Sequence, residues 1–158
     1  MTNELKINDT IPTFSLSLSD DTLLDSNDLK KKLHIIYFYP KDNTPGCTNE
    51  AKDFSSLIEE FKKINVEVIG VSKDSMKKHL NFIEKQDLKI ILGSDESGEV
   101  IEKFGVWVEK KMYGRTYMGI ERSTFVVSSD GKVVEIFRKV KVKNHAQNVL
   151  EKVKEILN

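Results

Sequence analysis

The feature that most constrains the fold is a continuous run of apolar residues from His34 to Tyr39, which ends at Pro40. A run of this length without polar alternation is typical of a β-strand that is buried on both faces. After a polar loop, apolar residues recur every three or four positions, which predicts an amphipathic helix over residues 45–63. A doubly buried strand that leads into such a helix is typical of α/β proteins.

Further strands are predicted on both sides of this unit. Alternating apolar residues predict a strand over residues 13–18, and continuous apolar runs predict strands over 66–71 and 89–92. Two β-rich runs, 122–128 and 132–140, are joined through Asp130-Gly131. Because glycine tolerates a positive φ, this dipeptide between two such runs is a strong hairpin signal.

Helical periodicity predicts three more helices. One covers residues 75–86, with Ser75 as its cap, and would bury Met76, Leu80 and Ile83. A short helix over 97–104 and an amphipathic helix over the closing segment follow. Residues 109–121 show no clear period and are expected to form an irregular loop.

The predicted order of elements is β, β, α, β, α, β, α, β, β, α, which implies a mixed sheet flanked by helices. We therefore expect an α/β sandwich of thioredoxin-like outline, with an N-terminal β extension. A length of 158 residues is usual for one domain, and no linker tract divides the chain. Residues 1–158 are accordingly expected to form a single domain.

Composition excludes several classes of protein. Because 25 basic residues balance 25 acidic ones, long-range attraction to nucleic acid or to anionic lipid is not expected. One cysteine excludes an internal disulfide framework and a multi-thiolate metal site. No apolar run is long enough to span a membrane, and the first residues lack the basic and apolar character of a signal peptide. The expected compartment is the cytoplasm.

The single cysteine lies where the doubly buried strand leads into the first long helix. Thr44 is a good N-cap residue, Pro45 suits the first helical position, and Gly46 allows close approach of other groups to the backbone. Cys47 therefore falls in the first turn, where free N–H groups and the helix dipole favour a thiolate. A lone cysteine can also be a small buried hydrophobe, but a polar loop favours the reactive interpretation.

The segment FYPKDNTPGCTNEAKDF, residues 38–54, resembles the active-site segment of the peroxiredoxins, most closely of the bacterioferritin comigratory protein (BCP) or PrxQ branch. Pro40, Thr44 and Cys47 meet the peroxiredoxin pattern Pro-x-x-x-Thr/Ser-x-x-Cys. The resemblance extends in the expected order over most of the chain, through residues 9–14, 104–110 and 122–125.

This resemblance implies a role for each residue of the pattern. Cys47 would be the peroxidatic nucleophile, and Pro40 would shield the pocket from water. Thr44 and Arg122 would bind and polarise the peroxide, and a guanidinium also stabilises a thiolate and offers several N–H donors. Glu50 could hold Arg122 through a charge-assisted pair. The alternatives are a simple strand terminator for Pro40, a plain helix cap for Thr44, and surface charges for Arg122 and Glu50.

The implied activity is that of a thiol-dependent peroxidase in antioxidant defence. It would reduce hydrogen peroxide and small organic hydroperoxides without metal, haem or flavin. Many PrxQ members carry a resolving cysteine five residues after the first, but Lys52 occupies that position here. The sulfenic acid formed at Cys47 would therefore be recycled by an external thiol: thioredoxin, glutaredoxin or a small thiol. By the same resemblance the protein is expected to be a monomer.

Two other functions compete with this one. A thioredoxin-like disulfide exchanger needs Cys-x-x-Cys, and its first position here is Thr44. A redox-switched chaperone or peroxide sensor that uses Cys47 only as a switch remains an alternative. Other residues are expected to have packing or surface roles: Trp107 in the core or pocket wall, and the three histidines, which lack ligand spacing, His34, His79 and His145.

Overall fold

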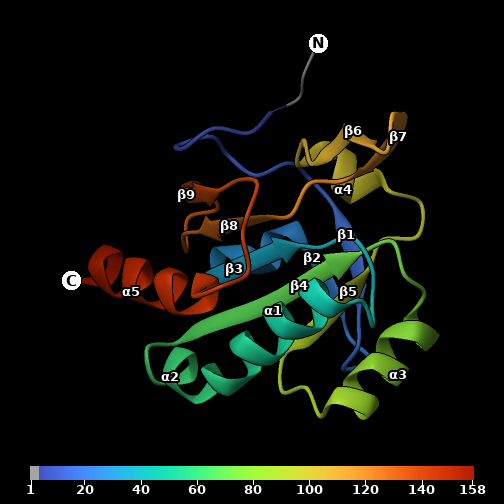
Figure 1. Ribbon diagram of the computed structural model, residues 1–158. Helices are drawn as coiled ribbons and strands as arrows, with labels where there is room; N and C mark the ends of the chain where they lie inside the picture. The colour runs from blue at the N-terminus through green and yellow to red at the C-terminus, as the bar shows by residue number, and fades with distance from the viewer. Residues whose placement is uncertain (1–3) are drawn as a thin grey trace.

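Strand β3 (Leu33–Phe38) is the doubly buried strand that the sequence predicts, and all of its residues are buried. In the computed structural model, which describes residues 4–158, it pairs in parallel with β4 (Val66–Ser72) and antiparallel with β8 (Ser123–Val127). Within the described residues these strands belong to a seven-stranded mixed sheet of order β2-β1-β5-β4-β3-β8-β9. The thioredoxin-like α/β sandwich is thus confirmed, with β1 and β2 as the N-terminal extension (Figure 1).

The remaining elements alternate along the chain. The other strands of the sheet are β1 (Ser15–Leu18), β2 (Leu23–Asp25), β5 (Ile91–Ser94) and β9 (Val133–Phe137). The helices are the 3₁₀ helix η1 (Ser26–Lys30), α1 (Pro45–Ser56), α2 (Ile58–Lys63), α3 (Met76–Gln86), α4 (Glu99–Lys103) and α5 (His145–Leu157). Among residues 4–158, no helix has the length and apolar character needed to cross a membrane.

The two faces of the sheet carry separate hydrophobic clusters. Helices α1, α2, α3 and α5 cover one face, where Phe54 of α1 stacks on Tyr37 of β3 with ring centroids 4.7 Å apart. Helix α4 lies over the other face, where Phe104 packs against Phe38 and Phe125. Consecutive residues of β3 therefore contribute to opposite clusters, which explains why the strand has no exposed position.

Two helices differ from the prediction. The helix expected over 45–63 breaks at Leu57, which separates α1 from α2. In α3, Leu80 is exposed, whereas His79 and Phe82 are buried. His79 takes the inward position because both ring nitrogens meet buried acceptors, Oδ2 of Asp42 and the Gly93 carbonyl. A hydrogen-bonded polar ring thus replaces the leucine that apolar periodicity assigned to the core.

The segment expected to be an irregular loop is a second, two-stranded sheet. Strands β6 (Trp107–Met112) and β7 (Arg115–Ile120) pair antiparallel through a two-residue turn, Tyr113-Gly114. Both turn residues have positive φ, as a type I′ turn requires. Residues 111–118 are all exposed, so no buried face imposed the alternation that marks a strand. The hairpin projects beyond the main sheet beside α4 (Figure 1).

Gly70 of β4 provides a test of the packing beneath α1. A Cβ atom at Gly70 would lie 2.6 Å from Cζ of Tyr37, whose ring is held by Phe54 and Tyr39. Because this rigid ring cannot yield, we expect Gly70→Ala to lower the free energy of unfolding by about 1–3 kcal/mol. Urea denaturation measures the change. Gly119→Ala is the control, since its Cβ would lie 3.2 Å from Cδ of the flexible Lys110 side chain, and an equal loss there would contradict the explanation.

Candidate active site

Cys47 lies in the first turn of α1, directly after the loop that follows β3. Its side chain is buried, with 2% of the residue exposed. Thr44 is the N-cap and Pro45 the first helical residue, as the sequence predicts. The sulfur thus sits at the carboxyl end of a parallel strand and at the N-terminus of a helix, two places where α/β proteins commonly bind anions and ligands.

The Thr44 side chain does not cap the helix. Its hydroxyl donates to the Lys41 carbonyl oxygen at 2.8 Å, so the prediction that this hydroxyl caps α1 is wrong in this structure. The first-turn N–H groups of Gly46 and Cys47 consequently have no side-chain cap. Unpaired N–H groups at a helix start can donate to an anion or to a polar ligand.

Arg122 connects Cys47 to Glu50. Its Nη2 lies 3.3 Å from the Cys47 sulfur, and its Nη1 donates to Oε1 of Glu50 at 2.7 Å. Arg122 precedes β8, and the pairing of Ser123 with Phe38 brings it to the end of β3. A Cβ atom on Gly46 would lie only 3.2 Å from Nη2 of Arg122, so the glycine leaves the space that the guanidinium occupies.

Burial affects the pKa values of both Glu50 and Arg122. The Glu50 side chain is 1% exposed. Burial raises the pKa of Glu50 to about 7, although the charge of Arg122 and the hydrogen bond from it act in the opposite direction. Burial lowers the pKa of Arg122, but Glu50 and Cys47 outweigh it and raise the pKa overall, so the guanidinium stays charged. Within the described residues, the second carboxyl oxygen of Glu50 is buried without a hydrogen-bond partner.

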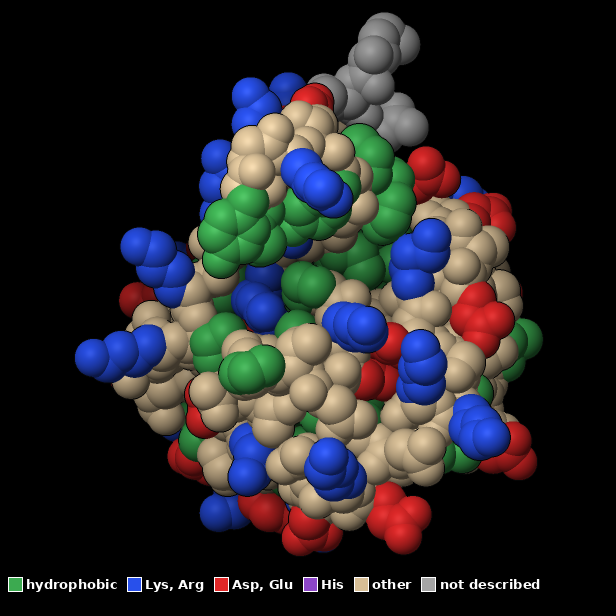
Figure 2. Space-filling view, turned by 45° about the vertical axis from the view of Figure 1, so that its right-hand side comes forward, with side chains coloured by type: hydrophobic (Ala, Val, Ile, Leu, Met, Phe, Trp, Pro, Cys, Tyr) green, Lys and Arg blue, Asp and Glu red, His purple; other side chains and the backbone are tan. Residues whose placement is uncertain are grey.

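The other predicted site residues lie at different depths. Pro40 is exposed where β3 ends, and Lys52 is exposed on α1. Trp107 is half-buried at the start of β6, with Nζ of Lys73 4.7 Å from its ring centroid. Lys110, on the same strand, is half-buried, and burial followed by the charge of Arg122 lowers its pKa. In Figure 2, basic and hydrophobic side chains meet around a hollow beside the projecting hairpin.

The three histidines are all buried, in agreement with packing roles. Nε2 of His145 lies 2.7 Å from the Thr124 hydroxyl, and burial, followed by the charge of Arg122, lowers the pKa of His145 to about 4. Nδ1 of His34 lies 2.9 Å from the Lys32 carbonyl oxygen. His79 is different, because it pairs with a carboxylate from the loop that precedes Cys47.

Sequence reasoning missed this carboxylate, Asp42. Ligand atoms of Asp42, Asp74 and His79 lie within 4.8 Å of one another, a grouping that could hold a metal ion. Both ring nitrogens and both Asp42 oxygens are, however, already within hydrogen-bond distance of protein groups, which identifies a hydrogen-bond network. The only signal in the sequence is a polar residue within the loop, because two of its partners, Asp74 and His79, lie more than 30 residues away.

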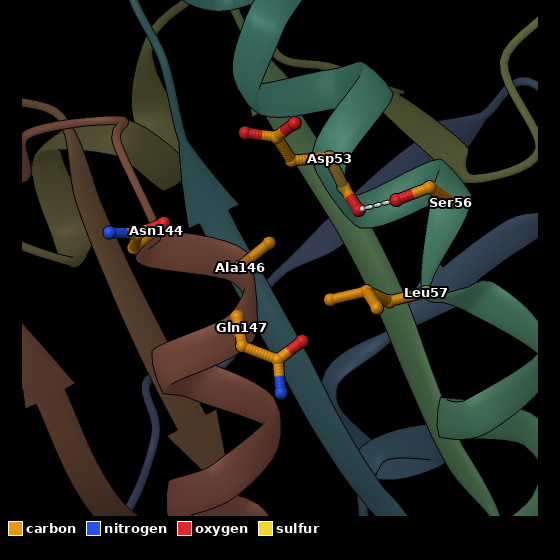
Figure 3. A pocket seen from close by; sticks show the side chains of 6 residues that line it. All are labelled: Asp53, Ser56, Leu57, Asn144, Ala146 and Gln147. Atoms are coloured by element: carbon orange, nitrogen blue, oxygen red, sulfur yellow. Dashed lines mark hydrogen bonds between the residues drawn. The ribbon is translucent and has the colours of Figure 1, made fainter.

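A separate pocket lies between α1 and the start of α5 (Figure 3). It includes none of Cys47, Thr44 or Arg122; its lining residues are Asp53, Ser56, Leu57, Asn144, Ala146 and Gln147. Asp53 lies six residues after Cys47 along α1. The pocket therefore does not contribute to the group of residues around the sulfur.

Comparison with known proteins agrees with this geometry. The model of the AhpC/TSA family matches residues 7–136, and the chain therefore belongs to this peroxiredoxin family. It is 44% identical to a "Putative peroxiredoxin bcp" of Helicobacter pylori strain J99, over 94% of this chain and 97% of that protein. It is 41% identical to "Peroxiredoxin Bcp" of Bacillus subtilis, over 96% of this chain and 97% of that protein.

Solved structures narrow the family to one branch. A PrxQ mutant of Xylella fastidiosa superposes with a TM-score of 0.93 at 40% identity, over 98% of this chain and 99% of that chain. The bacterioferritin comigratory protein of Xanthomonas campestris gives a TM-score of 0.88 at 42% identity, over 95% of this chain and all of that chain. Within the family, this protein is a Bcp/PrxQ peroxiredoxin with a single cysteine.

The pKa of Glu50 predicts a pH dependence of stability. Because folding raises it from 4.5 to about 7, the folded protein gains stability below about pH 4.5 that is lost as pH rises through about 7. From about pH 4 to about pH 8, we expect the wild type to lose about 3 kcal/mol relative to Glu50→Gln. Denaturant unfolding of both proteins across this range measures the difference. A constant difference would show that Glu50 titrates normally.

Proposed function

We propose that this protein is a thiol-dependent peroxidase in which Cys47 attacks hydrogen peroxide or a small organic hydroperoxide. The supporting observation is the position of Arg122, whose guanidinium lies 3.3 Å from the sulfur and 2.7 Å from Glu50. This arrangement gives the thiolate a fixed counter-charge. It also leaves further N–H donors of the guanidinium for a substrate oxygen.

The chemistry requires a thiolate and a place for the leaving oxygen. The Cys47 thiolate attacks one peroxide oxygen, the O–O bond breaks, and the bonding electron pair leaves with the other oxygen as hydroxide or alkoxide. A proton from solvent converts this to water or alcohol, and the sulfur is left as a sulfenic acid. Arg122 and the first-turn N–H groups of α1 are the donors proposed to stabilise the charge that moves onto these oxygens. The Thr44 hydroxyl, whose proton is bonded to the Lys41 carbonyl oxygen, is proposed to accept a hydrogen bond from the O–H of the bound peroxide.

Magnitudes show that activation of the sulfur is the smaller effect. An ordinary thiol with a pKa of about 8.5 is about 3% ionised at pH 7, so full ionisation raises the thiolate by about 30-fold at most. The intrinsic nucleophilicity of sulfur falls as its pKa falls. A larger acceleration must therefore come from donors that bind the transition state more strongly than the ground state.

The second half of the cycle depends on another molecule. Because the chain has one cysteine, the sulfenic acid forms a mixed disulfide with an external thiol and releases water, and a second thiol then regenerates Cys47. We propose thioredoxin, glutaredoxin or a small thiol as this reductant. Dependence on reduced thiols supports action in the cytoplasm. Since Cys47, Arg122 and Glu50 all come from one chain, we propose that a monomer is active.

Counting turnovers tests the proposed function against a switch that uses Cys47 only once. With hydrogen peroxide and an excess of a thiol reductant, we expect each chain to consume many equivalents of peroxide, because the external thiol returns the sulfur to its starting state. Consumption that stops near one equivalent with every reductant would favour the chaperone or sensor alternative. Cys47→Ser is the control and should consume none above background.

Replacement of Arg122 tests where the acceleration originates. We expect Arg122→Met to slow the reaction of Cys47 with hydrogen peroxide by about 100-fold or more, whereas loss of the thiolate accounts for at most about 30-fold. Stopped-flow fluorescence gives the rate, and the pH dependence of alkylation gives the thiolate fraction. Equal changes in both quantities would contradict transition-state stabilisation by Arg122. The control is Arg138→Met, which removes an arginine that directly follows β9 and contacts Glu4.

A further inference from the structure

Asp42 is the one buried residue between Pro40 and Thr44. Its Oδ1 accepts from the Tyr39 hydroxyl at 2.6 Å, and its Oδ2 lies 2.7 Å from Nδ1 of His79. Its backbone N–H donates to Oδ2 of Asp74 at 2.9 Å. The middle of the loop that precedes Cys47 is thus hydrogen-bonded to Tyr39 directly after β3, to α3 and to the segment between β4 and α3.

His79 is oriented by two acceptors on opposite sides of its ring. The side chain is completely buried, and Nε2 lies 2.8 Å from the Gly93 carbonyl oxygen of β5. A carbonyl only accepts hydrogen bonds, so Nε2 carries a proton. With Nε2 protonated, the remaining nitrogen is directed at the Asp42 carboxyl group. The ring therefore acts as a rigid strut between β5 and the loop.

The rest of this loop has little else to hold it. Pro40, Lys41 and Asn43 are exposed, and Asn43 has a φ of 61°, in the left-handed region. Thr44 is only half-buried, and its hydroxyl bonds within the loop to Lys41. Apolar packing therefore does not fix this segment, and its shape depends on the hydrogen bonds made by Asp42.

We propose that the buried Asp42–His79 pair is a positioning element of the peroxide site, which holds Pro40 and Thr44 in register with Cys47. The proposal rests on the peroxidase function proposed above. The pair touches neither the sulfur nor Arg122 in this structure and acts through the loop. Its loss should therefore slow the peroxide reaction more than it changes the chemistry of the thiol itself.

The physical reason is the cost of leaving one partner unpaired. A buried carboxylate without its partner is strongly unfavourable, so in His79→Leu the Asp42 side chain should turn toward water and move the loop with it. In Asp42→Ala the side-chain tie is absent. Asp42→Asn differs from both, because its amide can donate to Nδ1 of a neutral His79 and its oxygen can accept from Tyr39. That variant keeps every hydrogen bond of the pair without charge.

The experiment measures three quantities for each variant: the peroxide rate constant by stopped flow, the rate of Cys47 alkylation by iodoacetamide, and the thermal unfolding curve. At a temperature where every variant is folded, we expect His79→Leu and Asp42→Ala to lower the peroxide rate by about 10- to 100-fold. Their alkylation rates should change by less than about threefold, and Asp42→Asn should stay within about threefold of wild type in both reactions. A role in stability alone would leave both rates unchanged in the folded variants.

A double variant and a matched control complete the design. Replacing both partners leaves no unpaired charge, so Asp42→Ala/His79→Leu should react no more slowly than the slower single variant. His34→Leu removes a buried histidine at the opposite end of β3 and should keep the wild-type rate. If His79→Leu does not fold, the comparison of Asp42→Ala with Asp42→Asn decides the question.

The two proposals can fail separately. A wild-type protein whose Cys47 does not react with peroxide would refute the proposed function. A reactive wild type whose Asp42→Ala variant keeps the peroxide rate would refute only the positioning role. Equal losses in the peroxide and alkylation rates would also refute it, because the pair would then act on the thiol and not on the substrate loop.

Discussion

The contact of one guanidinium with a sulfur and a carboxyl group is the interaction on which the site depends. Cys47 and Glu50 lie one turn apart on α1, whereas Arg122 is more than 70 residues away along the chain. The antiparallel pairing of β8 with β3 places Arg122 beside the end of the strand that leads into α1. Sheet register thus determines the charge around the sulfur, and a shift by one residue would direct the side chain to the other face.

Burial strengthens the interaction between Arg122 and Glu50 and also makes it costly to the stability of the fold. Arg122 and Glu50 are both largely removed from water, so neither can lose the other without leaving a poorly solvated charge. The second Glu50 oxygen has no partner among the described residues, and the hydroxyl of Tyr37, also buried, has none either. Polar groups left unsatisfied near a reactive centre are a cost to stability that a purely structural core would avoid.

Local features of the site could be predicted from the sequence, but contacts between distant segments could not. The position of Cys47 in the first turn of a helix followed from Pro40, Thr44 and Pro45, because these residues determine where a strand ends and a helix begins. The approach of Arg122 was implied only by resemblance to a family. The face of α3 that is buried could not be predicted from apolar periodicity. The acceptors of His79 lie on a loop and a strand that are distant in sequence, and a pattern of apolar residues contains no information about such hydrogen-bond partners.

The two halves of the proposed cycle place different demands on the same helix turn. A peroxide is small enough to reach a sulfur in a residue that is 2% exposed, but the thiol of a protein is not. Lys52 is exposed on α1, and the chain has no second cysteine that could supply a sulfur from within. Reduction by a protein thiol therefore requires the start of α1 to loosen. The absence of a side-chain cap from Thr44 lowers the cost of that opening, while the ties of Asp42 to β3 and α3 confine it to the residues that follow.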